Sequence, residues 1–313
     1  VVDIEDIYDE FSYGISDPGA LRAFLKYAST QWRTRPRYVV LAGDGTWDYK
    51  DALGMGNPMP PMMVETPDGL FPSDNWYADF NGNGPEVALG RLPAANATEL
   101  TAMIDKIKAR EAATGSAWLK DALMVADNPD DGGDFTAGSA QIAGHLPAGT
   151  SVTSLNLAEL GADETRVRFL NGLNAGKGIV NYIGHGGYTV LADEGLLWAE
   201  DVDYPTNDKT PVMTAMTCLA GNFALPWVPS VAEQLVRKGG SGVAAMWAPS
   251  GMSENDLAVG LAETFYDSSN IRGTNTRLGD AVLASLKAYA GTDKPKYMLA
   301  IYGLLGDPAM KIK

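Results

Sequence analysis

Short apolar runs alternate along the chain with longer stretches in which apolar residues recur every three or four positions. The short runs lack an apolar–polar alternation, which is typical of strands buried on both faces of a parallel sheet. They lie at residues 38–42, 122–126, 152–157, 179–183, 212–217 and 243–247. Helical periodicity covers residues 18–30, 97–113, 136–145, 163–175, 230–238, 256–267 and 277–290. This alternation predicts an α/β fold with a mostly parallel sheet between two layers of helices.

Two segments interrupt the pattern and indicate how the chain is divided. Residues 44–93 are rich in glycine and proline and show little helical periodicity. The segment TGSAW at 114–118 has the composition of a junction. We therefore expect a smaller N-terminal α/β subdomain, residues 1–116, and a larger C-terminal subdomain, residues 117–313.

The composition indicates a folded, acidic protein. Of its 313 residues, 45% are hydrophobic, and no apolar run is long enough to span a membrane. The net charge of −15 disfavours a nucleic-acid partner, because an acidic surface repels phosphates. Such a charge suits the binding of calcium ions or cationic substrates. Alternatively, it only keeps the protein soluble.

Cys218 is the only cysteine, so an intrachain disulfide is excluded and the core must hold the fold. The chain starts at Val1, without an initiator methionine or a signal peptide. We therefore expect a processed product or an excised domain, which leaves the cellular compartment open.

Chemically active side chains follow three of the expected strands. Asp127, His185 and Cys218 each come within two residues of the end of an apolar run. Loops converge beyond the carboxyl ends of parallel strands, so we expect these side chains to meet. His185 is one of only two histidines and stands in the glycine-rich sequence GHGG. The three residues form a candidate Cys–His pair with an orienting acid.

These residue types suit nucleophilic catalysis by a thiol. An ordinary thiol is mostly protonated at neutral pH, and a neighbouring imidazole takes its proton as attack begins. The imidazole then protonates the leaving amine, while a carboxylate holds the ring. The glycines beside His185 leave room for a substrate backbone, and the amides of Gly186 and Cys218 are candidates for binding the oxyanion.

Structural roles stay open for each of these residues. A lone cysteine is commonly a small core residue, a histidine in a glycine turn is commonly a surface residue, and Asp-Asn-Pro at 127–129 is also an ordinary turn. A phosphate-binding glycine loop is disfavoured, because neither Lys nor Arg lies beside GHGG. His145, the other histidine, ends a helix before Pro147, and we expect it to be structural.

The chain resembles the gingipain-like cysteine peptidases, peptidase family C25, which share the caspase-like fold. The resemblance covers nearly the whole chain and is carried by YVVLAGDG (38–45), SDNWYADFNGNGPEVALGRLPA (73–94), LMVADN (123–128), NYIGHGG (181–187), TAMTCLAGNF (214–223) and YGLLGDPAM (302–310). Its most specific part is His-Gly after one strand and Cys after the next. It implies a caspase-like three-layer sandwich with a mostly parallel sheet in residues 117–313, preceded by the smaller α/β subdomain, truncated at its start.

By position, Cys218 is similar to the family's nucleophile, His185 to its catalytic histidine and Gly186 to its oxyanion-hole glycine. Asp127 matches, by role and place, the acid that steadies the histidine. The resemblance implies a cysteine endopeptidase acting on protein or peptide substrates, with no cofactor required for the chemistry. The alternatives are a transpeptidase of the same family and a catalytically inactive surface or secretion module. Family members are secreted or cell-surface zymogens, so we expect such a location and a prodomain or cleaved N-terminal segment as partner.

Two acidic residues are candidates for substrate binding. Asp134, in GGDFTAG, resembles by position the acid that meets the basic P1 side chain in arginine-specific gingipains. Glu254, in PSGMSEND, follows the strand next in sequence after Cys218. No Lys or Arg stands near GHGG or TCLAGN, so Arg or Lys is favoured over an acidic P1 residue. Alternatively, both acids cap helices.

The segment DFNGNGPE offers oxygen donors at alternate positions. Asp79, Asn81 and Asn83 are followed by a glycine and then by Glu86, as in the first half of a calcium loop. The same residues favour a tight Asn-Gly hairpin turn between NWYA and VALGRLP. Since calcium is common among gingipains, the resemblance implies a structural calcium site, at this loop or elsewhere.

Overall fold

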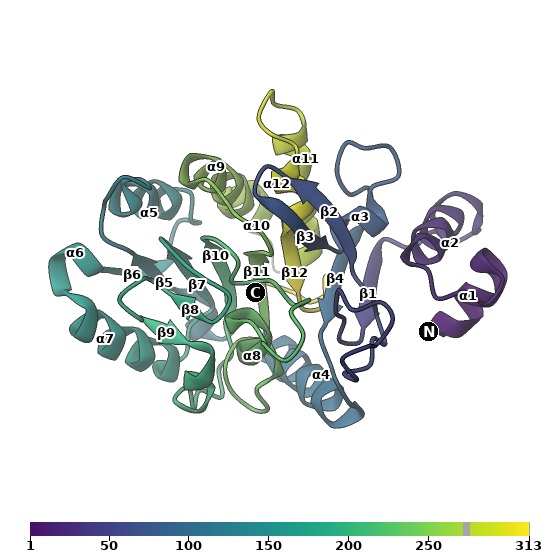
Figure 1. Ribbon diagram of the computed structural model, residues 1–313. Coiled ribbons are helices and arrows are strands. Elements are labelled where there is room, and N and C mark those ends of the chain that lie inside the picture. Colours follow the sequence, from purple (N-terminus) through teal and green to yellow (C-terminus); the bar gives the residue numbers. More distant parts are fainter. Residues whose placement is uncertain (272–275, 313) are drawn as a thin grey trace.

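The computed structural model describes residues 1–271 and 276–312, and its centre is one sheet of eight strands (Figure 1). The strands are β1 (Tyr38–Ala42), β4 (Ala88–Leu92), β5 (Asp121–Ala126), β6 (Ser151–Asn156), β7 (Ile179–Ile183), β10 (Val212–Met216), β11 (Ala245–Pro249) and β12 (Tyr302–Leu305). Their order across the sheet is β1-β4-β12-β11-β10-β7-β5-β6. All neighbours run parallel except β11 and β12, which are antiparallel. The predicted α/β fold with a mostly parallel sheet is confirmed.

Helices cover this sheet from both sides, as the pattern of apolar positions predicts (Figure 1). The longer ones are α2 (Pro18–Gln31), α4 (Ala97–Ala112), α5 (Phe135–Gly144), α7 (Ala162–Ala175), α8 (Val231–Arg237), α9 (Asn255–Tyr266) and α11 (Leu278–Ala290). The shorter ones are α1 (Ile4–Ser12), α3 (Asn75–Ala78), α6 (Leu157–Leu160), α10 (Ser268–Ile271), α12 (Tyr297–Ile301) and two 3₁₀ helices, Ala117–Lys120 and Ala199–Asp203. α9 packs against both α5 and α11, and α4 packs against α8.

Local signals explain where several helices begin. Asp17 accepts a hydrogen bond from the amide of Gly19, and Pro18 occupies the first turn of α2. Asn96 accepts from the amide of Glu99, whose carboxylate returns a bond to the amide of Ala95. The capping box expected before α4 is therefore formed, with the return contact one residue earlier.

The sequence pattern misses β4 and β12. All residues of β4 are buried, but Gly90 and the charged Arg91 break its apolar run. β12 has four residues and follows α12 without an intervening turn. NWYA forms the helix α3 rather than a strand, so the segment from Asp79 to Glu86 joins a helix to β4 and is no β-hairpin. Two small hairpins complete the fold: β2 (Met62–Thr66) with β3 (Gly69–Ser73), and β8 (Val190–Leu191) with β9 (Leu197–Trp198).

The sheet runs without a gap through both parts of the chain. β1 and β4, from residues 1–116, stand at one end, and Leu305 of β12 pairs with Arg91 of β4. A second, smaller core lies at this end, between the helix pair α1–α2 and the outer strands. The division into two subdomains near residue 116 stays a prediction.

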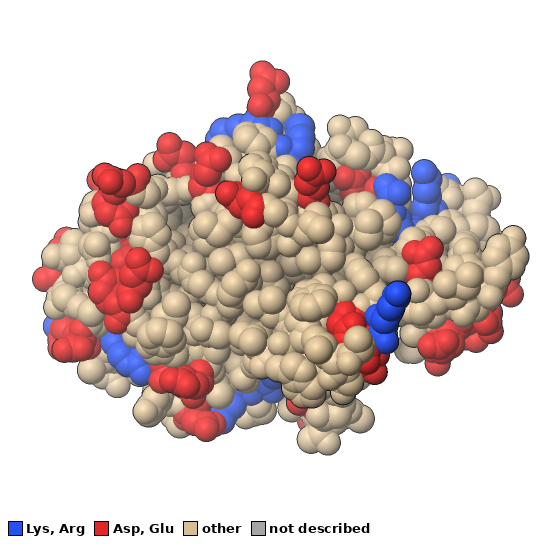
Figure 2. All heavy atoms as spheres, viewed as in Figure 1, with Lys and Arg blue, Asp and Glu red and all other residues tan. Residues whose placement is uncertain are grey.

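The surface carries its acidic charge unevenly. Figure 2 shows Asp and Glu side chains around the outline of one face and a broad area without charged side chains at its centre. Among the helices of the described residues, none has the length and apolar character needed to cross a membrane.

Candidate active site

Three neighbouring strands bring Asp127, His185 and Cys218 to one edge of the sheet. β10, β7 and β5 lie side by side in parallel, and their last residues pair in register. Because the chain leaves all three strands at the same level, the loops that follow lie together.

Cys218 and His185 line the same cavity, which has a volume of about 500 Å³. Further walls come from the loop 131–133, from residues 216–217 before the cysteine and from the segment 252–256 after β11. The structure therefore brings the thiol and the imidazole to a single concave site, large enough for a peptide side chain.

The thiol of Cys218 is partly buried and contacts the backbone of Ser253. The Ser253 amide donates to Sγ at 3.3 Å, and Sγ lies 3.5 Å from the carbonyl oxygen of the same residue. Burial raises the pKa of the Cys218 thiol, the Ser253 amide opposes this in part, and Asp68 adds to it. The Cys218 thiol is therefore neutral at pH 7 and needs a base to become a thiolate.

The imidazole of His185 is held by Asp130, which the sequence analysis does not name. Nε2 of His185 lies 2.8 Å from Oδ2 of Asp130, and both side chains are 39% exposed. Phe135 meets the ring edge-on, with centroids 5.2 Å apart. Gly132 is also so close that a Cβ there would lie 2.8 Å from Cε1 of the ring. The loop after β5 therefore fixes the orientation of the imidazole.

Asp130 also shows which nitrogen of the ring is free. The amide of Gly132, more than His185 itself, lowers the pKa of the Asp130 carboxyl, so this group is ionised at neutral pH. An ionised carboxylate only accepts hydrogen bonds, and Nε2 must therefore carry the proton. In the neutral imidazole Nδ1 then keeps its lone pair, as a general base requires.

Asp127 contacts the backbone of His185 instead of its ring. The carboxylate is buried, and its Oδ2 accepts the His185 amide at 3.0 Å and the Tyr182 hydroxyl at 3.2 Å. Oδ1 accepts the amide of Asn128 at 2.9 Å. Burial raises the pKa of Asp127, although these hydrogen bonds oppose the shift. Asp127 thus anchors the chain on which His185 stands, and the role of ring-orienting acid expected for it is taken by Asp130 in this structure.

Gly186 brings the backbone next to the nucleophile. A Cβ at this position would lie 2.4 Å from Oγ1 of Thr217 and 3.2 Å from the carbonyl oxygen of Cys218, so only glycine fits. Within the described residues, the amides of Gly186 and Cys218 donate to no protein acceptor. Two N–H groups near the thiol are therefore available to an oxygen atom of a substrate.

The two acids expected to bind substrate lie in different places. Glu254 is exposed on the wall of the cavity that contains Cys218, and its side chain makes no capping bond to α9. Asp134 caps α5, accepting the amide of Ala137 at 2.9 Å, and faces a neighbouring cavity of about 380 Å³. The capping alternative thus describes Asp134, and Glu254 is the acid that shares the site of the nucleophile.

His145 lies apart from this site, at the end of α5. Its Nε2 is 3.3 Å from Oε1 of Glu263, and its amide donates to the carbonyl of Ile142. These contacts fasten the end of one helix to α9, in line with the structural role expected for this histidine.

The loop expected to bind calcium uses its oxygens internally. Both carboxylate oxygens of Asp79 accept loop amides, three in all, at 2.6 to 3.1 Å. Asn81 donates to Glu86 at 2.6 Å, and Asn83 is exposed. The described residues include no group of three or more His, Cys, Asp or Glu side chains that could hold a metal. These donors do not fit a calcium loop, and calcium binding stays a prediction.

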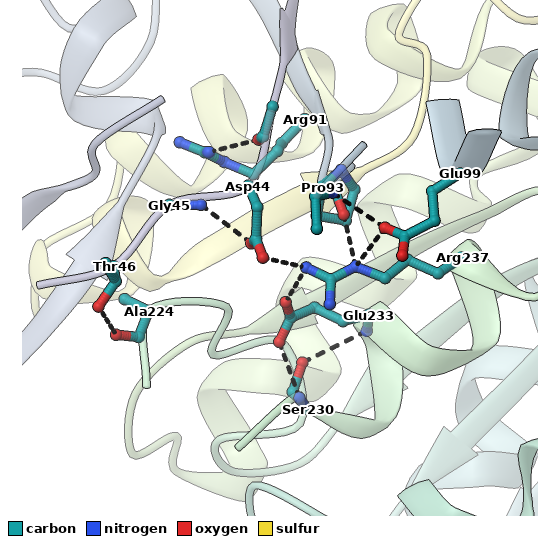
Figure 3. A network of polar contacts seen from close by, with 12 residues as sticks. Asp44, Gly45, Thr46, Arg91, Pro93, Glu99, Ala224, Ser230, Glu233 and Arg237 are labelled. Carbon is teal, nitrogen blue, oxygen red and sulfur yellow. Dashed lines mark hydrogen bonds and ion pairs between the residues drawn. The ribbon is translucent and has the colours of Figure 1, made fainter. Parts of the chain in front are cut away.

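A buried polar network supports the helix that follows the nucleophile (Figure 3). The guanidinium of Arg237, at the end of α8, lies 2.7 Å from Asp44, 2.8 Å from Glu233 and 3.9 Å from Glu99. Glu233 also accepts the amide of Ser230 at 2.7 Å, and burial raises its pKa to about 7. Since Asp44 follows β1, this network ties the first part of the chain to α8.

The loop between Cys218 and α8 is held at two further points. The carbonyl of Ala224 accepts the Thr46 hydroxyl and the Trp47 amide, both at 3.2 Å (the first bond is drawn in Figure 3). The amide of Leu219 donates to the carbonyl of Gly251 at 3.0 Å, with Leu219 in the left-handed region at φ 62°. The backbone that follows Cys218 is thus fixed at two points.

The chain matches the model for peptidase family C25 over residues 1–313. The complex of the pro- and mature domains of Porphyromonas gingivalis RgpB superposes with a TM-score of 0.80 and 21% identity, over 99% of this chain and 77% of that one. The Arg-specific cysteine proteinase gingipain R gives 0.80 at 22% identity, over 99% and 75%. Another solved protease gives 0.75 at 18%, over 95% and 69%. No curated protein sequence matches the chain.

The fold is that of the gingipains, a caspase-like α/β architecture around a large, mostly parallel sheet. The chain belongs to peptidase family C25 and is a cysteine-type peptidase.

Proposed function

We propose that the protein is an endopeptidase in which Cys218 is the nucleophile and His185 the general acid and base. The observation that carries this proposal is the shared cavity of the two side chains, at the ends of neighbouring strands. Cys218 is also the only thiol in the chain, so a cysteine peptidase of this sequence has no other candidate nucleophile.

The reaction follows from the protonation states of the site. Nδ1 of His185 takes the thiol proton as Sγ of Cys218 attacks the carbonyl carbon of the scissile bond. The amides of Gly186 and Cys218 stabilise the oxyanion, and the carboxylate of Asp130 stabilises the imidazolium. The imidazolium then protonates the leaving amine, and a thioester forms. Water, deprotonated by His185, hydrolyses the thioester and restores the thiol.

The Cys218→Ala variant tests this assignment, because it removes the nucleophile and little volume. We expect no cleavage of peptide substrates and an unchanged thermal melting temperature. A peptidyl chloromethyl ketone should attach to Cys218 in the wild-type protein only. Wild-type turnover by Cys218→Ala would overturn the assignment, and a wild-type protein that neither labels nor cleaves would favour the inactive module.

A preference for Arg or Lys before the scissile bond is the finer part of the proposal. Asp131, Glu254 and Asp256 line the cavity, and neither Lys nor Arg is among its lining residues. A cationic side chain entering this cavity would gain charge-assisted hydrogen bonds. Matched substrates with Arg or neutral citrulline before the bond measure this preference, and the Arg substrate should be cut far faster.

Glu254 and Asp134 can be separated as the source of this preference. Glu254→Gln should reduce the ratio of kcat/KM for the Arg and citrulline substrates. Asp134→Ala should leave that ratio unchanged and lower stability, because losing the helix cap costs about 1 kcal/mol. If the Asp134 variant lowers the ratio and Glu254→Gln does not, the preference for Arg is determined in the neighbouring cavity, which Asp134 faces.

We also propose secretion or surface display, with a prodomain as partner of the immature form. Its support is family membership and the solved complex of the pro- and mature domains of RgpB. Fractionation of the native host tests both points, because intact-mass analysis of the surface and medium fractions would reveal a longer precursor. Recovery of the protein from the cytoplasm alone would contradict this proposal.

A further inference from the structure

The connection between α2 and β1 carries three arginines in six residues. It reads WRTRPR and spans residues 32–37, between the helix end at Gln31 and the first residue of the strand at Tyr38. The protein has 24 Lys and Arg residues against 39 Asp and Glu residues, so a run of basic residues without an acidic neighbour is unusual for this chain.

The backbone of this segment has the features of a protease substrate. Residues 32–35 are exposed, and Trp32 is extended, with φ −69° and ψ 142°. From residue 33 to residue 36, the backbone makes no hydrogen bond with any described residue. A peptidase binds its substrate as an extended chain with free backbone groups, so little native structure must be broken to place this segment in an active site.

The three arginines differ in how firmly they are held. Arg33 makes no hydrogen bond or ion pair with a described residue, and Arg35 makes one hydrogen bond, to the carbonyl of Thr30 at 3.3 Å. Arg37 is paired with Asp280 at 2.8 Å and immediately precedes β1. Arg33 is therefore the arginine that can leave its place at the lowest cost.

We infer that the Arg33–Thr34 bond is a self-cleavage site, cut by a second copy of the same enzyme. This inference rests on the proposed activity and its preference for Arg. The next candidate, Arg35, precedes Pro36, which lacks an N–H and restricts the residue before it, so that bond is a poor substrate. Hydrolysis at Arg37 would require its ion pair and the start of β1 to be undone.

The arrangement of the sheet explains why the cut occurs between molecules. β1 stands at the end of the sheet, with β4, β12 and β11 between it and β10, the strand that Cys218 follows. At about 4.8 Å per strand the two strands are about 19 Å apart. The chain from Arg33 to Tyr38 spans at most about 18 Å when fully extended, so Arg33 does not reach the cavity of its own molecule while β1 remains in the sheet.

The reaction is the proposed one, with the chain as its own substrate. Sγ of Cys218 in one copy bonds to the carbonyl carbon of Arg33 in the other, and its proton passes through His185. The C–N bond to Thr34 breaks, and the nitrogen leaves as an amine with that proton. Water then cleaves the thioester, so the products are a carboxylate at Arg33 and a new N-terminus at Thr34.

The cut leaves a folded protein of two chains. α1 and α2 bury Tyr8, Leu21 and Leu25 in the smaller core, which holds them to the outer strands without the covalent link. Arg22 adds hydrogen bonds to the carbonyl of Asp79 and lies over the ring of Trp76 at 4.7 Å. All eight strands of the sheet follow residue 33, so the nick does not interrupt the catalytic architecture.

The test uses Cys218→Ala as a substrate that cannot cut itself. Incubated with a catalytic amount of wild-type enzyme, it should yield one new N-terminus, at Thr34, by intact-mass and N-terminal analysis. Cys218→Ala incubated alone should stay whole. In the same background, Arg33→Gln should abolish the nick, and the matched control Arg35→Gln should keep it. Melting temperatures of both variants show that they are folded.

Two further measurements separate failure of this inference from failure of the proposed function. Wild-type enzyme is assayed on a small Arg peptide, and Cys218→Ala is digested briefly with trypsin, which also cuts after Arg. Absence of the Thr34 terminus overturns the inference in every case. If the Arg peptide is cleaved, the proposed function survives that result. If the wild-type enzyme also fails to cleave the Arg peptide, while trypsin cleaves the Arg33–Thr34 bond of Cys218→Ala, the proposed preference for Arg is wrong as well.

Discussion

Asp127 holds His185 by its backbone, with Oδ2 3.0 Å from the amide nitrogen. The ring of this histidine is instead engaged by Asp130, at 2.8 Å from Nε2. Two carboxylates three residues apart thus divide a task that one acid performs in a linear catalytic triad. Asp127 fixes the position of the residue, and Asp130 fixes the orientation and tautomer of its imidazole.

Asp130→Asn should lower kcat/KM by about tenfold to a hundredfold, because the imidazolium loses a negative partner. This is less than the roughly 10⁴-fold effect of a buried orienting carboxylate, since Asp130 is exposed in part. Steady-state kinetics on one peptide measure this loss, and a wild-type kcat/KM would show that Asp130 has no influence on the base.

Asp127→Asn should act mainly on stability. Oδ1 of the carboxylate accepts the amide of Asn128 and Oδ2 accepts the amide of His185, and the single oxygen of an amide side chain cannot replace both acceptors. Leaving a buried donor unsatisfied costs about 1 to 3 kcal/mol, which denaturant unfolding would measure. A variant as stable as the wild type, with the rate loss expected for Asp130→Asn, would reverse the two roles.

His185→Ala should reduce turnover by several orders of magnitude, because catalytic residues that act as a unit lose most of their effect when one of them is removed. His145→Ala removes only the contact with Glu263 and should alter the melting temperature more than the rate. Steady-state kinetics of both variants on one peptide provide the comparison. A larger rate loss for His145→Ala would show that His185 is the wrong choice of catalytic histidine.

Alkylation of the free enzyme should reveal a thiol rather than a thiolate. Because burial raises the pKa of Cys218, the thiolate fraction is small at pH 7 and grows as pH rises through the raised pKa. The rate with iodoacetamide should therefore still increase above pH 9, beyond the midpoint of an ordinary cysteine. A plateau between pH 6 and 8 would instead indicate a thiolate–imidazolium ion pair at rest.

Asp74→Asn should destabilise the fold strongly. Its carboxylate receives two hydrogen bonds of 2.7 Å from Arg91, and both side chains are buried. Breaking such a pair leaves an uncompensated charge and costs about 3 to 5 kcal/mol. Glu164→Gln breaks the exposed pair with Arg168 and should cost about 0.3 to 0.5 kcal/mol. Urea unfolding of the two variants measures both losses of unfolding free energy. Similar losses would mean that burial does not determine how much these ion pairs contribute to stability.

The buried parallel strands could be predicted because each is a continuous apolar run between helical periods. β4 could not, since Arg91 is a charged residue in a fully buried strand, and its partner Asp74 lies in another segment. The pairing of β12 with β4 and β11 depends on contacts between distant parts of the chain, which leave no local pattern.

The site was predictable where it depends on strand ends and less so where it depends on loop geometry. Cys218, His185 and Gly186 follow from their positions after buried strands. Asp130 carries no such signal, because DNPDDGGD offers several carboxylates and only the folded loop selects the one that reaches the ring. The same limitation affects Asp134, whose side chain caps the first turn of α5.

The position of β12 between β4 and β11 has a consequence for biosynthesis. The strands made first, β1 and β4, can join the rest of the sheet only after residue 305 has left the ribosome, because β12 is the link. During translation the growing chain therefore holds the nucleophile and its histidine without the completed sheet beside them, and such late, long-range pairing slows folding. A truncated polypeptide that stops before this strand would lack the junction between β4 and β11 altogether.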